Sequence, residues 1–217
     1  MGKQDLADKA IVVTAGGTQE PIDAVRHIGN RSSGKMGYAL AEAARDRGAQ
    51  TTLITAPTAL QEPAGMNIIN VKTVAEMRKA VLEATSQADI LIMAAAVSDF
   101  RIANPADHKI KKTGGKLLLE LVETPDFLLE LRNDFIKVGF AAESEDLLAN
   151  ARKKLTEKRL DLIVANDITA ADSGFDVDTN RVTLIDKEGK VEELPLMSKR
   201  EVAEVILDRV AGLIEKS

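Results

Sequence analysis

One stretch, residues 11–37, constrains the fold more than any other part of the chain. It begins with the apolar run Ile11-Val12-Val13, which predicts a buried strand, and it breaks at Gly16-Gly17, where glycine permits a sharp turn and a close ligand. A polar loop then leads into an alanine-rich helix, predicted from about Met36 to Arg47. Because a helix N-terminus attracts anions, this order of parts predicts a phosphate-binding βα unit.

Two common nucleotide-binding motifs do not fit this stretch. Residues 29–36, GNRSSGKM, lack the hydroxyl side chain that ends a P-loop, and they lie well beyond the strand. Residues 15–20 lack the spaced glycines of a dinucleotide fingerprint. The only tyrosine, Tyr38, is followed four residues later by Glu42, so the Tyr-x-x-x-Lys pair of many reductases is absent.

Composition narrows the class of protein. The 217 residues are enough for one α/β domain, which we expect to span 1–217. A net charge of −5, no tryptophan and a single tyrosine argue against a nucleic-acid partner. No apolar stretch reaches the ~18 residues that span a bilayer, and the N-terminus lacks a signal peptide, so we expect no membrane partner and a cytoplasmic protein. There are no cysteines, and the two histidines show no metal spacing.

The rest of the chain alternates strand and helix patterns. Strands are predicted at 50–55, 68–71, 89–94, 117–122, 136–141, 161–165, 181–185 and 190–194. Helices are predicted from Thr73, with Glu76 completing a capping box, to about 87, and over 126–133, 145–158 and 198–215. This order predicts a three-layer, Rossmann-like α/β domain with a mostly parallel central sheet and a late β-hairpin.

The strand predicted at 89–94 runs into Ala94-Ala95-Ala96 and then Asp99, and small residues at that end of a parallel strand make room for a ligand. The loop that follows, residues 101–116, is glycine-containing and rich in lysine. It fits a mobile flap over a polyphosphate and a solvated surface loop equally well.

Taken together, four motifs resemble those of the phosphopantothenoylcysteine synthetase family, and the resemblance covers nearly the whole chain. They are TAGGTQEPIDAVRHIGNRSSGKMG, AAAVSDF with the downstream KIKK, VGFAAE and LIVANDI. Two positions depart from the family pattern: Gly29 stands where a hydroxyl residue is usual, and Ser98 where alanine is frequent.

The resemblance implies a ligase of coenzyme A biosynthesis. Such enzymes activate 4′-phosphopantothenate with CTP, in the presence of Mg²⁺, to an acyl-cytidylate, and L-cysteine then displaces CMP. Eukaryotic relatives use ATP. In most bacteria this ligase follows a flavin-dependent decarboxylase in one protein; we expect no flavin in this chain, and whether it is free-standing or excised stays open. The resemblance also implies a homodimer, for which the late hairpin 181–194 is the candidate surface, with Arg26 reaching the partner's site.

The resemblance further assigns site residues. Asn30 and Lys109 are the implied catalytic residues, although Asn30 also fits an Asx-turn or a helix cap. The implied nucleotide-binding residues are Met93, Ala94, Ala95, Asp99, Lys109, Pro125, Asp126, Phe127, Leu128, Phe140, Lys154 and Lys158. The implied substrate-binding residues are Arg26, Asn30, Ser32, Ser33, Gly34, Lys35, Ala95 and Ala96. Within the nucleotide-binding set the resemblance implies that Asp99 is an acid of the nucleotide site, a partner for the base, the ribose or a metal ion, and the metal ligands stay open.

Three functions therefore remain in view. The ligase is favoured. An NAD(P)-dependent oxidoreductase is suggested only by the βα architecture. A non-catalytic nucleotide-binding or scaffolding domain is the third.

Overall fold

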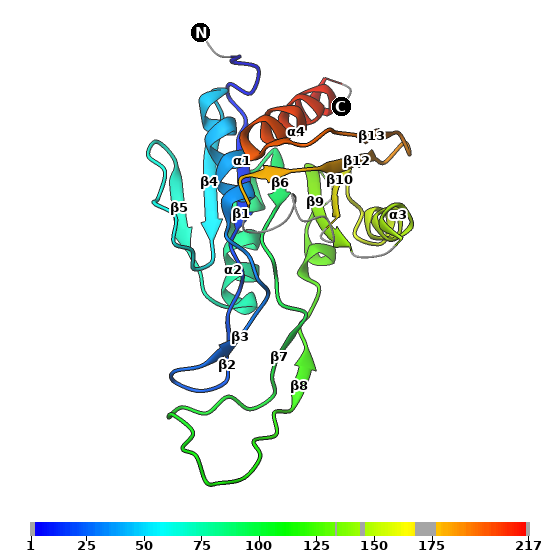
Figure 1. Cartoon of the computed structure of the whole chain (residues 1–217). Coiled ribbons are helices and arrows are strands. Elements are labelled where there is room, and N and C mark those ends of the chain that lie inside the picture. Colours follow the sequence, from blue (N-terminus) through cyan, green and yellow to red (C-terminus); the bar gives the residue numbers. More distant parts are fainter. Residues whose placement is uncertain (1–2, 133, 144–145, 168–176, 216–217) are drawn as a thin grey trace.

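A computed structural model describes residues 3–132, 134–143, 146–167 and 177–215. Its centre is an eight-stranded sheet with the order β13-β12-β10-β9-β6-β1-β4-β5 (Figure 1). The parallel strands are β1 (Ala10–Ala15), β4 (Gln50–Thr55), β5 (Asn67–Asn70), β6 (Ile90–Met93), β9 (Ile136–Glu143) and β10 (Leu162–Asp167). The antiparallel hairpin β12 (Val182–Asp186) and β13 (Val191–Glu193) closes one edge, so the mostly parallel sheet and the late hairpin are confirmed.

Helices cover both faces of this sheet. On one face lie α1 (Lys35–Asp46) and α4 (Lys199–Ile214), which pack on alternate strand residues such as Val13 and Ile92. On the other face lie α2 (Val74–Ala84) and α3 (Leu147–Glu157), against residues of the opposite parity such as Val12 and Ile163. The predicted three layers are therefore confirmed, and we call the sheet with its four helices the body.

Local chemistry sets where these elements begin and turn. The predicted capping box at the start of α2 is present, because Thr73 accepts from the Glu76 N–H and Glu76 accepts from the Thr73 N–H. Ser198 and Glu201 form a second capping box at the start of α4. After β1 the chain turns at Gly16, whose φ is +79° and where a Cβ would lie 2.6 Å from the Ala56 carbonyl oxygen, so only glycine fits.

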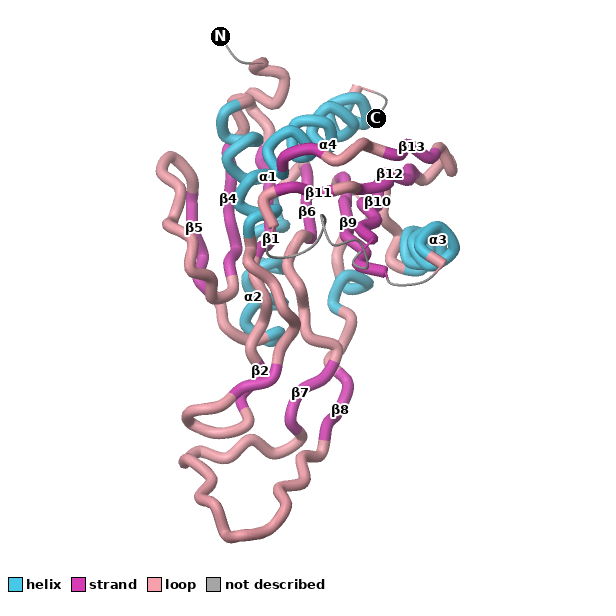
Figure 2. Tube along the Cα trace, in the orientation of Figure 1, coloured by secondary structure: helices cyan, strands magenta, loops and turns pink. Residues whose placement is uncertain are grey.

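A second region, which we call the arm, extends away from the body (Figures 1 and 2). It comprises residues 19–29, with the short hairpin β2 (Glu20–Pro21) and β3 (His27–Ile28), and residues 99–124, with the ribbon β7 (Phe100–Ile102) and β8 (Leu121–Glu123). The sequence analysis did not predict β2, β3 or β7. Nor did it predict the small bridge between β11 (Thr179–Asn180) and β14 (Met197–Ser198).

Two predictions near the arm were wrong. The strand predicted at 117–122 is reduced to β8, which pairs with β7 and not with the central sheet, because residues 117–120 are solvent-exposed and pair with no described strand. The helix predicted at 126–133 is a single 3₁₀ turn, η2 (Phe127–Glu130), which ends where Leu131 is extended and the chain heads into β9. The end predicted for α2 also contains a 3₁₀ turn, η1 (Thr85–Gln87).

No helix among the described residues is long and apolar enough to cross a membrane.

Candidate active site

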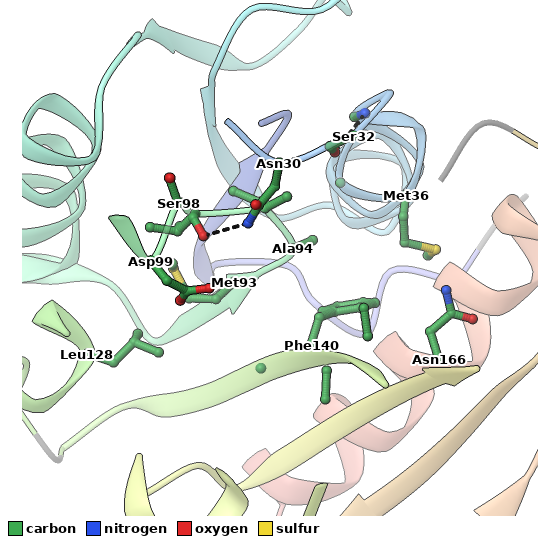
Figure 3. A pocket seen from close by; sticks show the side chains of 18 of the residues that line it. Asn30, Ser32, Met36, Met93, Ala94, Ser98, Asp99, Leu128, Phe140 and Asn166 are labelled. Atoms are coloured by element: carbon green, nitrogen blue, oxygen red, sulfur yellow. Dashed lines mark hydrogen bonds between the residues drawn. The ribbon is translucent and has the colours of Figure 1, made fainter. Parts of the chain in front are cut away.

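A cavity of about 560 Å³ opens where the parallel strands β6, β9 and β10 reach their carboxyl ends. Most of its lining comes from the loop into α1, the end of β6, the turn before η2, β9 and α3. This is the edge of an open α/β sheet at which ligands bind. Figure 3 shows Asn30, Ala94, Asp99 and Phe140 around the same space.

The first wall is the start of α1. Its N-cap is Gly34, at φ +77°, and no described side chain caps the helix or places a carboxylate in its first turn. The Ser32 hydroxyl accepts from the Gly34 N–H at 3.3 Å, and the Lys35 ammonium lies 2.7 Å from Asp178. That ion pair holds the pKa of the Asp178 carboxyl below its usual value. Because the helix end is positive and uncapped by an acid, this wall suits a phosphate group.

The second wall is the backbone after β6, which two threonines of the β1 region hold in place. The Thr14 hydroxyl accepts from the Ala95 N–H at 3.1 Å, and the Thr18 hydroxyl accepts from the Ser98 N–H at 2.9 Å. The Asn30 carboxamide donates to the Val97 carbonyl at 3.0 Å, which brings the predicted catalytic asparagine onto this wall. One of its two amide hydrogens is used here, and no described residue accepts the other, which leaves it for a ligand.

The third wall combines the turn before η2 with α3. The Lys158 ammonium lies 3.1 Å from one oxygen of Asp126, and the other oxygen accepts from the Leu128 N–H at 3.2 Å. The Leu128 N–H is therefore already bound by the Asp126 carboxylate. Phe140 faces the cavity from β9 (Figure 3), and Lys154 completes the wall.

Most predicted site residues therefore share one cavity. Every predicted nucleotide-binding residue except Lys109, and every predicted substrate-binding residue except Arg26, lines it. These two lie on the arm. Lys109 is exposed there, and the Arg26 guanidinium is bound to Asp23, with a distance of 3.0 Å from Nε to Oδ2.

The sequence analysis missed several lining residues. Asn166, at the end of β10, is 7% exposed, and its Oδ1 has no hydrogen-bond partner in the described part of the chain. Asn180 and the buried Lys199, whose ammonium donates to the Val177 carbonyl at 2.6 Å, also line the cavity. The rule that ligands lie at the carboxyl ends of parallel strands points to Asn166, which lies in the LIVANDI motif. No sequence pattern points to the other two.

The cavity offers few carboxylates that could hold a metal ion. Among the described residues no group of three or more histidines or acids could hold a metal ion. Two carboxylates line the cavity: Asp126, which is paired with Lys158, and the exposed Asp99. Mg²⁺ is usually held by one or two carboxylates together with substrate phosphates, and Asp99 beside a bound nucleotide fits that pattern.

Comparison with known proteins then decides the family. Residues 6–213 match the family described as the DNA/pantothenate metabolism flavoprotein C-terminal domain. The chain belongs to this family.

Its relatives agree with that assignment. The chain is 49% identical over 216 residues to the coenzyme A biosynthesis bifunctional protein CoaBC of Bacillus subtilis, covering 98% of this chain and 53% of that protein. A crystal structure of the C-terminal domain of a CoaBC protein superimposes with a TM-score of 0.85 at 38% identity, covering 99% and 100% of the two chains. The DNA/pantothenate metabolism flavoprotein from Streptococcus pneumoniae gives 0.81 at 26%, covering 94% and 99%. The chain spans about half the length of the curated CoaBC relatives it matches.

Proposed function

We propose that this chain is a phosphopantothenate–cysteine ligase of coenzyme A biosynthesis, with residues 1–217 forming its ligase domain. One observation carries the proposal: residues from each of the four family motifs, including Asn30, Ala95, Phe140 and Asn166, line a single cavity. The relative at 49% identity is named for coenzyme A biosynthesis. Nothing in these comparisons favours the NAD(P)-dependent oxidoreductase.

In the first step, a carboxylate oxygen of 4′-phosphopantothenate attacks the α-phosphorus of CTP, an acyl-cytidylate forms, and pyrophosphate leaves. Backbone groups of Met93 to Ala95 bind the base, while Phe140 packs beside it. Lys154 and Lys158 face the phosphates. The uncapped start of α1, with Ser32, Ser33, Gly34 and Lys35, receives the phosphate of phosphopantothenate.

Because the attack brings one anion against another, positive charge must offset the repulsion. Lys109 supplies part of it once the arm loop closes over the cavity. Mg²⁺, when bound with CTP, would add charge neutralisation at the phosphates, and Asp99 is the protein carboxylate placed to hold it. CTP is proposed over ATP on the strength of the family resemblance.

In the second step, the amine of L-cysteine attacks the acyl carbon, the bond to CMP breaks, and the amide forms with loss of a proton from nitrogen. Asn30 is the proposed donor to the oxygen that gains negative charge, through the amide hydrogen not given to Val97. The side chains of Ala95 and Ala96 flank the intermediate without obstructing it.

A homodimer is also proposed, but on a surface other than the late hairpin. Exposed apolar side chains gather on the arm, where Leu118 is 88% and Val25 62% exposed. Leu117, Leu121 and Phe100 are further exposed apolar residues of the arm. A second copy is the occupant proposed here, because the arm also carries Arg26, which the resemblance assigns to the partner's site. We also propose that a flavin-dependent decarboxylase, fused to this chain or separate from it, acts on the product of the ligase.

A pyrophosphate-release assay tests the function. With CTP and phosphopantothenate alone we expect release of about one pyrophosphate per site, and with L-cysteine continuous turnover. ATP in place of CTP should turn over far more slowly. Absence of pyrophosphate with either nucleotide would refute the ligase, and calorimetric binding of a nicotinamide cofactor would revive the oxidoreductase.

A further inference from the structure

Asp23, on the β2–β3 loop of the arm, is a buried carboxylate that the proposed mechanism does not use. Its side chain is fully buried. One oxygen accepts from the backbone N–H groups of Val25 and Arg26, each at 2.9 Å. The other accepts from the Arg26 guanidinium and, at 3.0 Å, from the backbone N–H of Ile110. This buried carboxylate therefore joins two segments that are 87 residues apart in sequence.

Ile110 is held from both sides. Its N–H donates to Asp23, and its carbonyl accepts from Arg26 Nη2 at 3.1 Å. The Ala106 N–H donates to the Ile22 carbonyl at 3.0 Å and makes a second link between the same two segments. We call the contacts of Asp23 and Arg26 with Ile110 the latch.

The latch acts next to the proposed catalytic lysine. The N–H that Asp23 accepts belongs to the peptide bond that joins Lys109 to Ile110. A peptide unit is planar and contains the Lys109 Cα and carbonyl group as well as the Ile110 N–H. Fixing that N–H therefore also fixes the orientation of the Lys109 carbonyl and the position of the Lys109 Cα. Beyond the latch the loop has few contacts with the rest of the protein. Residues 111–120 are all exposed, and a Cβ added at Gly114 or Gly115 would touch nothing.

We propose that Asp23 is a positioning residue for Lys109. It acts through Ile110, with Arg26 as its counterion. It holds the backbone of Lys109 in place, so that only the lysine side chain has to move for its ammonium to reach the cavity. This inference rests on the proposed ligase function. Its physical reason is entropic: a lysine on a freely moving loop loses more conformational freedom on closing than one whose backbone is already held.

The test compares Asp23→Ala with Asp107→Ala, the same change at an exposed acid on the loop that carries Lys109. Single-turnover formation of the acyl-cytidylate and hydrogen exchange of the peptide containing Ile110 are measured on each. We expect Asp23→Ala to slow activation about 10- to 100-fold and to lose protection at Ile110, while Asp107→Ala does neither. Asp23→Asn, which keeps one acceptor oxygen, should fall between them.

A double variant separates positioning from mere structural support. In a Lys109→Gln background, Asp23→Ala should slow activation no further, because the group it positions is gone. An equal slowing in both backgrounds, or faster exchange at Ile110 with an unchanged activation rate, would overturn the positioning role alone. A wild-type protein that releases no pyrophosphate would instead refute the proposed function, and the positioning role with it.

Discussion

The body and the arm are held together by different means. In the body, strands such as β1 and β6 are buried on both faces, and Val13 and Ile92 have no solvent exposure. In the arm, Leu118 is 88% exposed, and the pairing of β7 with β8 extends over only three residues of each strand. Burial of apolar surface therefore fixes the body, whereas hydrogen bonds and one ion pair fix the arm.

Charge is also used differently. In the body, the Arg47 side chain is 3% exposed and pairs with Asp5 and, at 2.8 Å, with Asp208, which joins α1, α4 and the N-terminal segment. In the arm, Asp23 and Arg26 hold a loop against a hairpin, not one core element against another. The cavity walls thus belong to the apolar-packed part of the molecule, and the proposed lysine lies at the point where the latch ends and the exposed loop begins.

The largest difference should appear in stability. Ile92→Ala removes a fully buried side chain from β6 and should lower the free energy of unfolding by about 2–5 kcal/mol. Leu118→Ala, a truncation of similar size on the arm, should change the stability of the monomer by no more than about 0.5 kcal/mol. Urea denaturation of both variants at the same protein concentration measures the contrast. Equal losses would show that the arm has a core of its own.

Asn30→Asp should divide the two half-reactions. The change keeps the size of the side chain but replaces its donor with an acceptor, and losing one such donor costs roughly 3–4 kcal/mol, or two to three powers of ten in rate. Pyrophosphate should appear for one turnover and then stop, with the acyl-cytidylate detected by mass spectrometry of quenched mixtures.

The control is Asn104→Asp, the same change at an exposed arm residue, which should keep full turnover. The structure adds a complication, because the new carboxylate would face the Val97 carbonyl that Asn30 now contacts. Loss of the first step alone in Asn30→Asp would therefore show that the asparagine supports the wall and not the chemistry.

Lys109→Gln should slow formation of the acyl-cytidylate about 100-fold and leave the melting temperature unchanged. The lysine is exposed and packs against nothing buried, so its stability contribution is within about 0.5 kcal/mol, while its charge offsets repulsion in the first step. Lys116→Gln, at the other end of the same loop, is the matched control. Equal slowing in both variants would mean that the loop acts through its total charge.

The same contrast explains what the sequence could predict. The bounds of β4 and the capping box of α2 follow from local patterns, because a run rich in β-branched residues and the Thr73–Glu76 pair specify them without help from distant residues. The cavity walls follow from the rule that parallel strands present ligands at their carboxyl ends. These elements and the cavity walls belong to the body, where the apolar residues of each strand and helix are buried against a neighbouring layer.

The arm and its contacts could not be predicted in this way. The leucines at 117–119 form a strand-like run, but no sheet lies beside them, so the run stays exposed. Pro125 and Asp126 mark a helix start correctly, yet nothing local shows that only one 3₁₀ turn fits before β9. Asp23 reads as an ordinary loop acid, because the Ile110 N–H that it binds lies 87 residues away in sequence.

A smaller effect is expected in assembly. Leu118→Asp places a charge on the apolar surface of the arm and should weaken the proposed dimer at least about tenfold, which corresponds to 1.4 kcal/mol. Light scattering across micromolar concentrations should then report the mass of one chain. Leu196→Asp, at an exposed leucine beside the late hairpin, is the control. If Leu196→Asp dissociated the dimer and Leu118→Asp did not, the interface would lie on the late hairpin, as the sequence analysis expected.

The smallest expected effect is a weakening of the latch at low pH. Hydrogen bonds from Arg26, then from the N–H groups of Ile110, Val25 and Arg26, hold the pKa of the Asp23 carboxyl well below its usual range. A carboxyl with a lowered folded pKa contributes stability that is complete above its unfolded pKa, about 3.9, and is lost as pH falls toward the folded value. The latch should therefore keep its strength from pH 7 to about pH 4.5 and weaken below that.

The body also contains carboxylates with lowered pKa, including Asp5 and Asp208, which face Arg47, but its apolar core does not titrate. Acid should accordingly release the arm before it unfolds the body. Hydrogen exchange, corrected for the intrinsic rate at each pH, should show protection falling first in residues 103–112 while β1 and β6 stay protected. Asp23→Asn, which cannot titrate, should show no such step in the arm. Loss of protection in both regions at one pH would mean that arm and body unfold as a single unit.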